Sequence, residues 1–147
     1  MIYIAHRGNL YGPSDRENTL HHINEALDKG FAVEVDVLDY RDNLFYLGHD
    51  QEQASCGPEY LSGKNIFAHA KNLKSLDSLM THGIQCFYHT DEDYVLTSTN
   101  LIWAYPGQVL NDRTICVLPE LYPMKDWKKC YGVCSDFIAN YRAEVEV

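Results

Sequence analysis

The chain has 147 residues, of which 46% are hydrophobic, and a formal net charge of −9. This length is that of one ordinary domain with a real core, so we expect a single domain over residues 1–147. The negative charge argues against nucleic acid or an anionic membrane as a partner, and an anionic substrate would need local positive charge from Arg, Lys or a bound cation.

Short apolar runs recur along the chain, and polar residues follow each of them. The runs are rich in Val, Ile, Phe and Tyr and are about four to seven residues long, which is typical of buried strands. They are Met1–Ala5, Phe31–Val37, Leu44–Leu47, Asn65–Ala70, Gln85–Tyr88, Asn100–Ala104, Thr114–Leu118 and Tyr131–Cys134.

Helical spacing appears between some of these runs. Asn18-Thr19 predicts the start of a helix that ends at Gly30, and Asn72 predicts the start of a second helix that ends near Gly83. The later connections predict a short turn or helix at Leu96–Ser98 and loops at Tyr105–Arg113 and Pro119–Lys125.

The alternation of strands and helices favours an α/β fold with parallel strands. A complete eight-stranded (β/α) barrel usually needs about 250 residues, and only nine residues separate Ala104 from Thr114. We therefore expect a reduced or incomplete (β/α) TIM-type barrel with about seven parallel strands and few helices in the second half.

Chemically capable side chains stand at the ends of most runs. In parallel α/β folds ligands bind at the carboxyl ends of the strands, so these side chains should converge on one mouth. They are His6, Arg7, Glu34, Asp36, His49, Asp50, His69, Lys71, His89, Trp103, Glu120, Ser135 and Asp136.

Glu34 and Asp36 are two positions apart on an expected strand, so both point to the same face. Two inward-facing carboxylates would repel each other and would be costly to bury. A divalent cation resolves this conflict, and oxygen ligands suit Mg²⁺ or Ca²⁺. The alternative is a solvent-facing polar face of an amphipathic strand, and the presence of His6 and His49 favours the metal site.

Four short motifs resemble the glycerophosphodiester phosphodiesterases, whose motifs H-R-G, P-E-N-T, E-x-D and H-D occur in this order. The corresponding residues are His6-Arg7-Gly8, Glu17-Asn18-Thr19, Glu34-x-Asp36 and His49-Asp50. The resemblance covers about residues 1–50 and continues more faintly through 65–72 and 131–138. Phosphatidylinositol-specific phospholipases C share the same barrel class.

The resemblance implies a role for each matching residue. His6 and His49 would be the general acid and base, in an order that the sequence leaves open, and Arg7 would bind the phosphate. Glu34 and Asp36 would bind the divalent metal, with Glu17 supporting the site. Lys71 falls where the family has an E-x-K strand whose Lys faces the phosphate.

The chain departs from the family pattern in three ways. His69 stands where the third metal carboxylate is expected, and histidine makes a softer site than oxygen ligands do. Arg16 replaces the proline of P-E-N-T. The chain is also much shorter than usual members, although Cys134–Phe137 resembles their closing strand. Glu120 is an alternative third carboxylate.

The expected function is hydrolysis of a small or head-group phosphodiester by histidine acid–base catalysis at a divalent metal. One alternative is a catalytically silent barrel that binds phosphorylated ligands, and another is a reaction that ends in a cyclic phosphate. His89 and Trp103 are candidate pocket residues, although a polar strand end and a core aromatic are the simpler interpretations. His21, His22 and His82 should face solvent.

The five cysteines are an odd number and contain no C-x-x-C pair, which argues against a disulfide framework and a zinc knuckle. Cys86 and Cys116 are most simply buried hydrophobes. The N-terminus is too quickly polar for a signal peptide, and no segment has the ~18 apolar residues that stable membrane insertion needs. A cytoplasmic location is therefore expected, and a homodimer would cover an apolar edge exposed by a reduced barrel.

Overall fold

Ten strands form one mixed sheet in the computed structural model, which describes residues 1–123 and 126–146. The strands are β1 (Ile2–His6), β2 (Ala32–Arg41), β3 (Leu44–Leu47), β4 (Ala54–Cys56), β5 (Ile66–Ala70), β6 (Cys86–Tyr88), β7 (Tyr94–Leu96), β8 (Ile102–Ala104), β9 (Thr114–Val117) and β10 (Gly132–Ser135). The helices are α1 (Leu20–Asp28), α2 (Pro58–Leu61), α3 (Leu73–Thr81) and α4 (Ile138–Glu146), with 3₁₀ turns η1 (Pro119–Leu121) and η2 (Trp127–Lys129).

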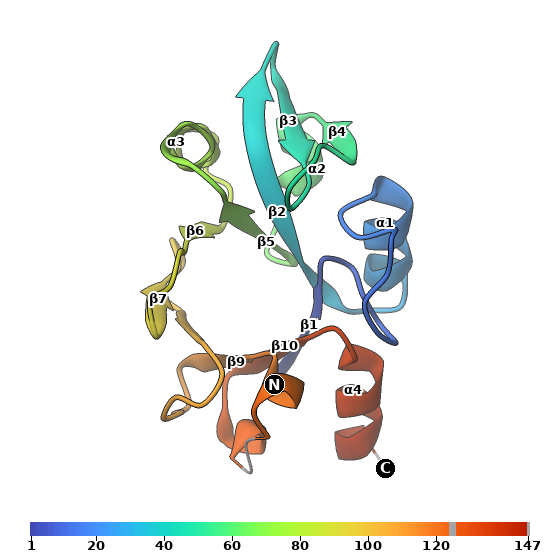
Figure 1. Ribbon diagram of the computed structural model, residues 1–147, viewed down its shortest axis with the longest axis vertical. Helices are drawn as coiled ribbons and strands as arrows, with labels where there is room; N and C mark the ends of the chain where they lie inside the picture. The colour runs from blue at the N-terminus through green and yellow to red at the C-terminus, as the bar shows by residue number, and fades with distance from the viewer. Residues whose placement is uncertain (124–125, 147) are drawn as a thin grey trace.

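Seven strands run parallel and lie side by side in the order β6, β5, β2, β1, β10, β9, β8. Figure 1 shows how this sheet curves around a central region, with α1 and α4 on the outside. Within the described residues, α4 is the only α-helix after α3. The α/β class and the scarcity of helices in the second half are as predicted.

The sheet is not a closed parallel barrel, so the expected TIM-type barrel is not confirmed. β2–β3, β3–β4 and β7–β8 are antiparallel, and no strand pairing joins β6 to β7 among the described residues. A single backbone hydrogen bond links this region, in which Ser98 N, just after β7, donates to the carbonyl oxygen of Cys86 in β6 at 2.8 Å.

The prediction that the Leu44–Leu47 run is a parallel strand is wrong. The run forms β3, which is antiparallel to β2 and is the return arm of a hairpin. Asp42 and Asn43 between the two arms have φ of 54° and 64°. A two-residue turn with both φ values positive matches the twist of antiparallel strands. Since Asp and Asn tolerate this conformation, the local sequence turns the chain straight back.

Side chains from all seven parallel strands fill the interior of the curved sheet. This cluster contains Ile4, Ala32, Phe67, Phe87, Trp103, Ile115, Val117 and Cys134, each at most 4% exposed. A second, larger cluster lies between the outer face of the sheet and the helices. Strands buried on both faces read as continuous apolar runs, which explains why the sequence shows runs and not alternation.

The two expected helix starts are correct. The Thr19 side chain caps α1 by accepting from His22 N, and that of Asn72 caps α3 by accepting from Ser75 N. Cys86 and Cys116 are buried free thiols, as predicted.

Other local predictions need correction. Leu96 ends β7 and a turn follows it, whereas η1 occupies the start of the expected Pro119–Lys125 loop. Residues 124–125 of that loop lie outside the described part of the chain. Tyr105–Arg113 is a loop, as expected. Among the described residues no helix has the length and apolar character to cross a membrane.

Gly132 of β10 pairs with Ile2 of β1, and a Cβ atom at Gly132 would be 2.8 Å from the Ile2 carbonyl oxygen. We expect Gly132→Ala to lower the free energy of unfolding by about 1–3 kcal/mol, measured by urea denaturation. Gly57→Ala is the control, because its Cβ would meet only the flexible end of Glu59; its loss should stay below about 1 kcal/mol. Equal losses in the two variants would contradict this account of the β1–β10 contact.

Candidate functional site

The polar residues at one end of the sheet continue the inward-facing rows of the interior cluster. Alternate residues of a strand share a face, and His6, His69 and Asp136 each stand two positions beyond an interior residue of the same row. The strand register sets His6 beside Glu34 and Asp36 beside His69. The predicted convergence of strand-end side chains therefore occurs for the strands β1, β2, β5 and β10.

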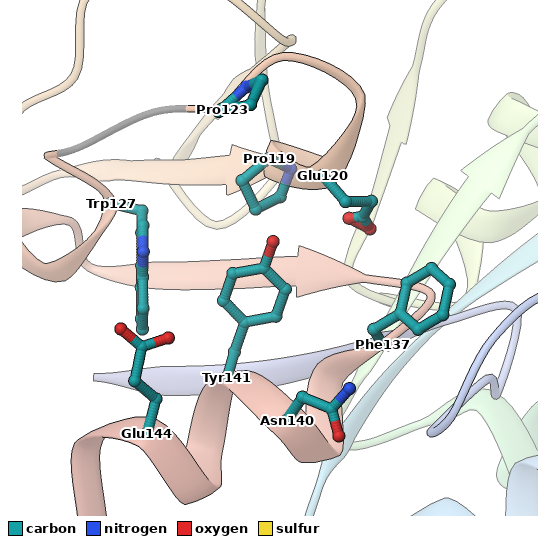
Figure 2. Close-up of a pocket in the computed structure, with 8 residues that line it drawn as sticks. All are labelled: Pro119, Glu120, Pro123, Trp127, Phe137, Asn140, Tyr141 and Glu144. Carbon is teal, nitrogen blue, oxygen red and sulfur yellow. The ribbon is translucent and has the colours of Figure 1, made fainter.

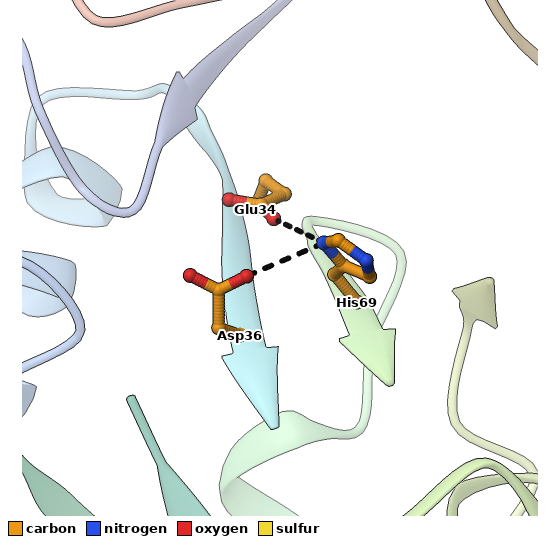
Figure 3. A group of neighbouring side chains, drawn as sticks. All are labelled: Glu34, Asp36 and His69. Carbon is orange, nitrogen blue, oxygen red and sulfur yellow. Dashed lines mark ion pairs between the residues drawn. The ribbon is translucent and has the colours of Figure 1, made fainter. Parts of the chain in front are cut away.

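Glu34, Asp36 and His69 form a compact group at the centre of this end (Figure 3). Their ligand atoms lie within 4.8 Å of one another, and His69 Nδ1 is 3.5 Å from Glu34 Oε2 and 3.3 Å from Asp36 Oδ1. Asp36 Oδ1 is buried without a hydrogen bond of good geometry. This buried oxygen, with a second carboxylate and an imidazole nitrogen beside it, fits a cation, so the group could hold a metal ion.

Asp36 is fully buried and is surrounded by donors. Asn18 brackets it, donating from Nδ2 to Oδ2 at 3.0 Å and accepting from the Asp36 backbone N at 2.9 Å. Arg7 Nε lies 3.0 Å from Oδ2, and Lys71 Nζ lies 3.3 Å from Oδ1. Burial alone would raise the pKa of Asp36, but His69, Lys71 and Arg7 outweigh it and hold the pKa well below its usual range.

His69 carries a positive charge in this arrangement. Burial lowers its pKa, but the hydrogen-bonding carboxylates of Asp36 and Glu34 outweigh burial and raise the pKa to about 9. The ring also stacks on Phe87, with 4.8 Å between the centroids. The imidazolium thus lies where a metal ion would bind the same two carboxylates, and the two cations exclude each other.

Arg7 links the carboxylates to the loop that carries His49. Its backbone has φ of 56°, so the chain turns sharply after β1, and its backbone N donates to Glu34 Oε1 at 3.1 Å. The guanidinium donates to Glu17 Oε1 at 3.2 Å and to His49 Nδ1 at 2.8 Å. Glu17 therefore supports the site through Arg7.

The Arg7 contact also fixes the protonation of His49. An arginine can only donate, so His49 Nδ1 accepts and the ring is the neutral tautomer with hydrogen on Nε2. Burial, followed by the charges of Arg7 and Lys71, lowers the pKa of His49. His49 comes from a loop after an antiparallel strand, so it reaches the site by a different route from the one predicted.

His6 is held by Asp136, a strand-end residue to which the sequence assigned no role. His6 Nδ1 lies 2.7 Å from Asp136 Oδ1, and Asn9 Nδ2 donates to the same oxygen at 2.9 Å. Burial lowers the pKa of His6, but Glu34 and Asp136 outweigh it and the net pKa is raised. Asp136 follows the last predicted strand, so its position was visible in the sequence, but its pairing with a residue 130 positions away was not.

Two other expected pocket residues lie away from the site, and a third lies at its edge. Trp103 is 1% exposed and stacks on Phe87 in the interior, so it does not line an open groove. Glu120 accepts from Ser135 Oγ at 2.6 Å and lies outside the group that could hold a metal, so it does not replace the third carboxylate. His89 stacks on Tyr105 at the edge of the site.

The prediction that His22 faces solvent is wrong: the ring is half-buried, and its Nε2 donates to Asn9 Oδ1 at 2.8 Å. The expectation rested only on its place on a predicted helix. The loop between β1 and α1 folds back over the first turn of α1, and the Asn9 amide thereby connects His22 with Glu17 and Asp136.

Negative charge exceeds permanent positive charge at this end of the sheet. The four carboxylates are those of Glu17, Glu34, Asp36 and Asp136. The two permanent cations are Arg7 and Lys71. Two negative charges remain to be balanced, either by protonated His6 and His69 or by a divalent cation.

In comparisons with known proteins, no family model, curated protein or solved structure matches the chain.

Metal binding to Glu34, Asp36 and His69 must displace the proton of His69. Because a protonated imidazole cannot ligate, the Kd for Mg²⁺ or Mn²⁺ should fall by about tenfold per pH unit between about pH 6 and pH 8, below the pKa of about 9. Calorimetry in buffers of different ionisation enthalpy measures both the affinity and the released proton. His69→Gln is the control and should flatten this dependence. An affinity that is independent of pH in the unaltered chain would remove His69 from the ligand set.

Proposed function

We propose that the chain is a metal-dependent phosphodiesterase, a short and divergent relative of the glycerophosphodiester phosphodiesterases that its first 50 residues resemble. One observation carries the proposal: two histidines held in defined orientations, His6 and His49, flank a carboxylate pair that could hold a cation. Acid–base groups on both sides of a cation site are what cleavage of a phosphodiester requires.

Arg7 and Lys71 would bind the substrate phosphate. Both already lie within 3.3 Å of Asp36, one as a planar fork and the other as a point charge. We propose Mg²⁺ or Ca²⁺ as the cation, since two of the three ligands are carboxylates. Such an ion would neutralise charge on a phosphate oxygen and lower the pKa of a neighbouring hydroxyl group.

The hydrogen bonds favour His6 as the general base and His49 as the general acid. The Asp136 carboxylate accepts from His6 Nδ1, which leaves Nε2 as the nitrogen that takes a proton from the attacking hydroxyl or water, as in other carboxylate–histidine pairs. Arg7 donates to His49 Nδ1, so His49 can act as the general acid only after Arg7 turns to the substrate phosphate and a proton binds at Nδ1; the imidazolium then gives its Nε2 proton to the leaving alkoxide and returns to the neutral ring. The raised pKa of His6 makes it a stronger base and the lowered pKa of His49 makes it a stronger acid, while both shifts reduce the fraction of each ring in the protonation state that its role needs.

The substrate would be a small or head-group phosphodiester, because a net charge of −9 disfavours a long polyanion. The nucleophile is either water or a hydroxyl of the substrate itself. Phosphorus NMR of the products separates these two cases, since an internal hydroxyl yields a cyclic phosphate.

Replacing either histidine should abolish most of the activity. After chelator treatment and addition of Mg²⁺, Ca²⁺ or Mn²⁺, His6→Ala and His49→Ala should each hydrolyse bis(p-nitrophenyl) phosphate about 10²–10⁴-fold more slowly than the unaltered chain. His21→Ala is the matched control, because His21 is exposed on α1 outside the site. Equal rates for all four chains, or a rate independent of metal, would count against the enzyme.

His69 between the two carboxylates favours one other candidate, a catalytically silent module that binds phosphorylated ligands. The imidazolium already neutralises the carboxylates without metal. In that case dimethyl phosphate should bind in the presence of chelator, with Arg7→Gln weakening it, while no diester is cleaved.

Asp136 should control the pH dependence through His6. A protonated His6 cannot act as base, so activity is lost as pH falls through the raised pKa of His6. Asp136→Asn removes one of the causes that raise this pKa. The acid limb of the kcat/KM profile should therefore move to lower pH, while the plateau falls by up to about 10⁴-fold. A lower plateau with an unmoved acid limb would show that Asp136 does not act through His6.

A further inference from the structure

A separate cavity of about 450 Å³ lies between the 3₁₀ turns η1 and η2 and the outer helix α4 (Figure 2). Its lining includes aromatic rings, two carboxylates and an amide, from Trp127, Phe137, Tyr141, Glu120, Glu144 and Asn140. None of these residues belongs to the group that could hold a metal. The cavity is therefore a second region, apart from the candidate metal site, where aromatic, acidic and amide side chains lie close together.

The walls of this cavity are aromatic. Trp127 and Tyr141 meet edge to face with 5.0 Å between their ring centroids, and Trp127 is 7% exposed, so the rings hold each other in place. Lys128 Nζ lies 5.5 Å from the Trp127 centroid and 3.1 Å from Glu144 Oε1. A cation of the chain itself thus already rests against the aromatic and acidic rim.

Glu120 supplies a fixed negative charge inside the cavity. Ser135 Oγ donates to both of its oxygens, at 2.6 and 3.0 Å, and the Asp136 backbone N donates at 3.2 Å. Figure 2 shows the Tyr141 hydroxyl pointing toward the same side of the cavity as Glu120. Burial, followed by the charge of Glu120, raises the pKa of Tyr141 to about 12, so the phenol remains a neutral donor.

Glu144 is paired with Lys128 at the rim, but no positive charge matches Glu120 inside the cavity. Among the described residues that line the cavity there is no Lys or Arg. Aromatic faces attract cations through the ring quadrupole, and the attraction increases when the cation is desolvated. An anionic ligand would be repelled by the carboxylates of the lining. A neutral apolar ligand would gain nothing from the negative charge of Glu120.

We propose that this cavity is a binding site for a small organic ammonium ion that carries an apolar arm. The ammonium group lies against Glu120 and the Tyr141 hydroxyl, and the apolar arm packs between the aromatic rings. The cavity shares no ligand residue with the metal-holding group, and the two places meet only through the backbone N of Asp136, which donates to Glu120. The ammonium site does not rest on the proposed phosphodiesterase activity.

Three probes of nearly equal shape test the charge requirement: phenethylammonium, 2-phenylethanol and 3-phenylpropanoate. Titration of the full chain, followed by ¹H–¹⁵N NMR, should show phenethylammonium binding about tenfold or more tightly than the neutral alcohol, with no binding of the anion. The largest shifts should fall on the Trp127 indole and the backbone of η1 and α4. Equal binding of the amine and the alcohol, or shifts centred on Glu34 and Asp36, would overturn the proposal.

Charge-neutral variants sharpen the test. Glu120→Gln keeps an oxygen acceptor for Ser135 and should weaken phenethylammonium binding by about fivefold or more. Glu146→Gln is the control and should leave the binding unchanged, because Glu146 is exposed at the end of α4 and does not line the cavity. If Glu120→Gln does not fold, Glu144→Gln tests the same charge from the other wall, with a smaller loss because Lys128 already pairs with it. Unchanged affinity in the folded variants would remove the carboxylates from the site and overturn the proposal.

Discussion

The buried negative charge of Asp36 is the constraint on which the candidate site depends. A carboxylate with no solvent exposure, one residue away from the equally buried Val35 and two from Glu34, is costly unless it is paired and hydrogen-bonded. Its partners come from separate segments: Arg7 follows β1, Asn18 precedes α1, and Lys71 follows β5. Compensating this one charge therefore fixes the loops at the carboxyl ends of neighbouring strands, so the groups available for chemistry also hold this part of the fold together.

The same constraint explains why histidine can stand at position 69. A third carboxylate beside Glu34 and Asp36 would add charge that only a cation could balance, and the site would be strained without one. An imidazole instead offers two states: protonated, it balances the carboxylates itself, and neutral, it supplies a nitrogen ligand. The carboxylate pair is therefore balanced at neutral pH without a metal. As a consequence, a proton and the metal compete for His69 Nδ1.

The sequence revealed the parts of the site that local patterns encode. His6 directly follows an apolar run, whereas Glu34, Asp36 and His69 lie within such runs, and a period of two on parallel strands brings these residues together. Other features depend on geometry that no local pattern carries. The Leu44–Leu47 strand reverses because both turn residues at 42 and 43 adopt positive φ, which turns an expected parallel strand into a hairpin arm. The pairing of His6 with Asp136 depends on β1 and β10 being neighbours, and the separation of Glu120 from the carboxylate pair depends on η1 carrying its side chain to the outside of β10.

The two halves of the parallel sheet are stabilised by different side chains, and this difference accounts for the scarcity of helices in the second half. The half formed by β1, β2 and β5 carries the charged groups and is covered by α1 and α3, whose packing keeps water from the outer face. In the other half, Phe87 and Trp103 stack at 4.5 Å inside the sheet, and His89 stacks on Tyr105 at 3.6 Å above them. Large rings bury more area per residue than aliphatic side chains, so this half holds its shape with short connections. As a result the site is asymmetric: the phosphate of a ligand would meet Arg7 and Lys71, and whatever alcohol it carries would meet the rings of His89 and Tyr105.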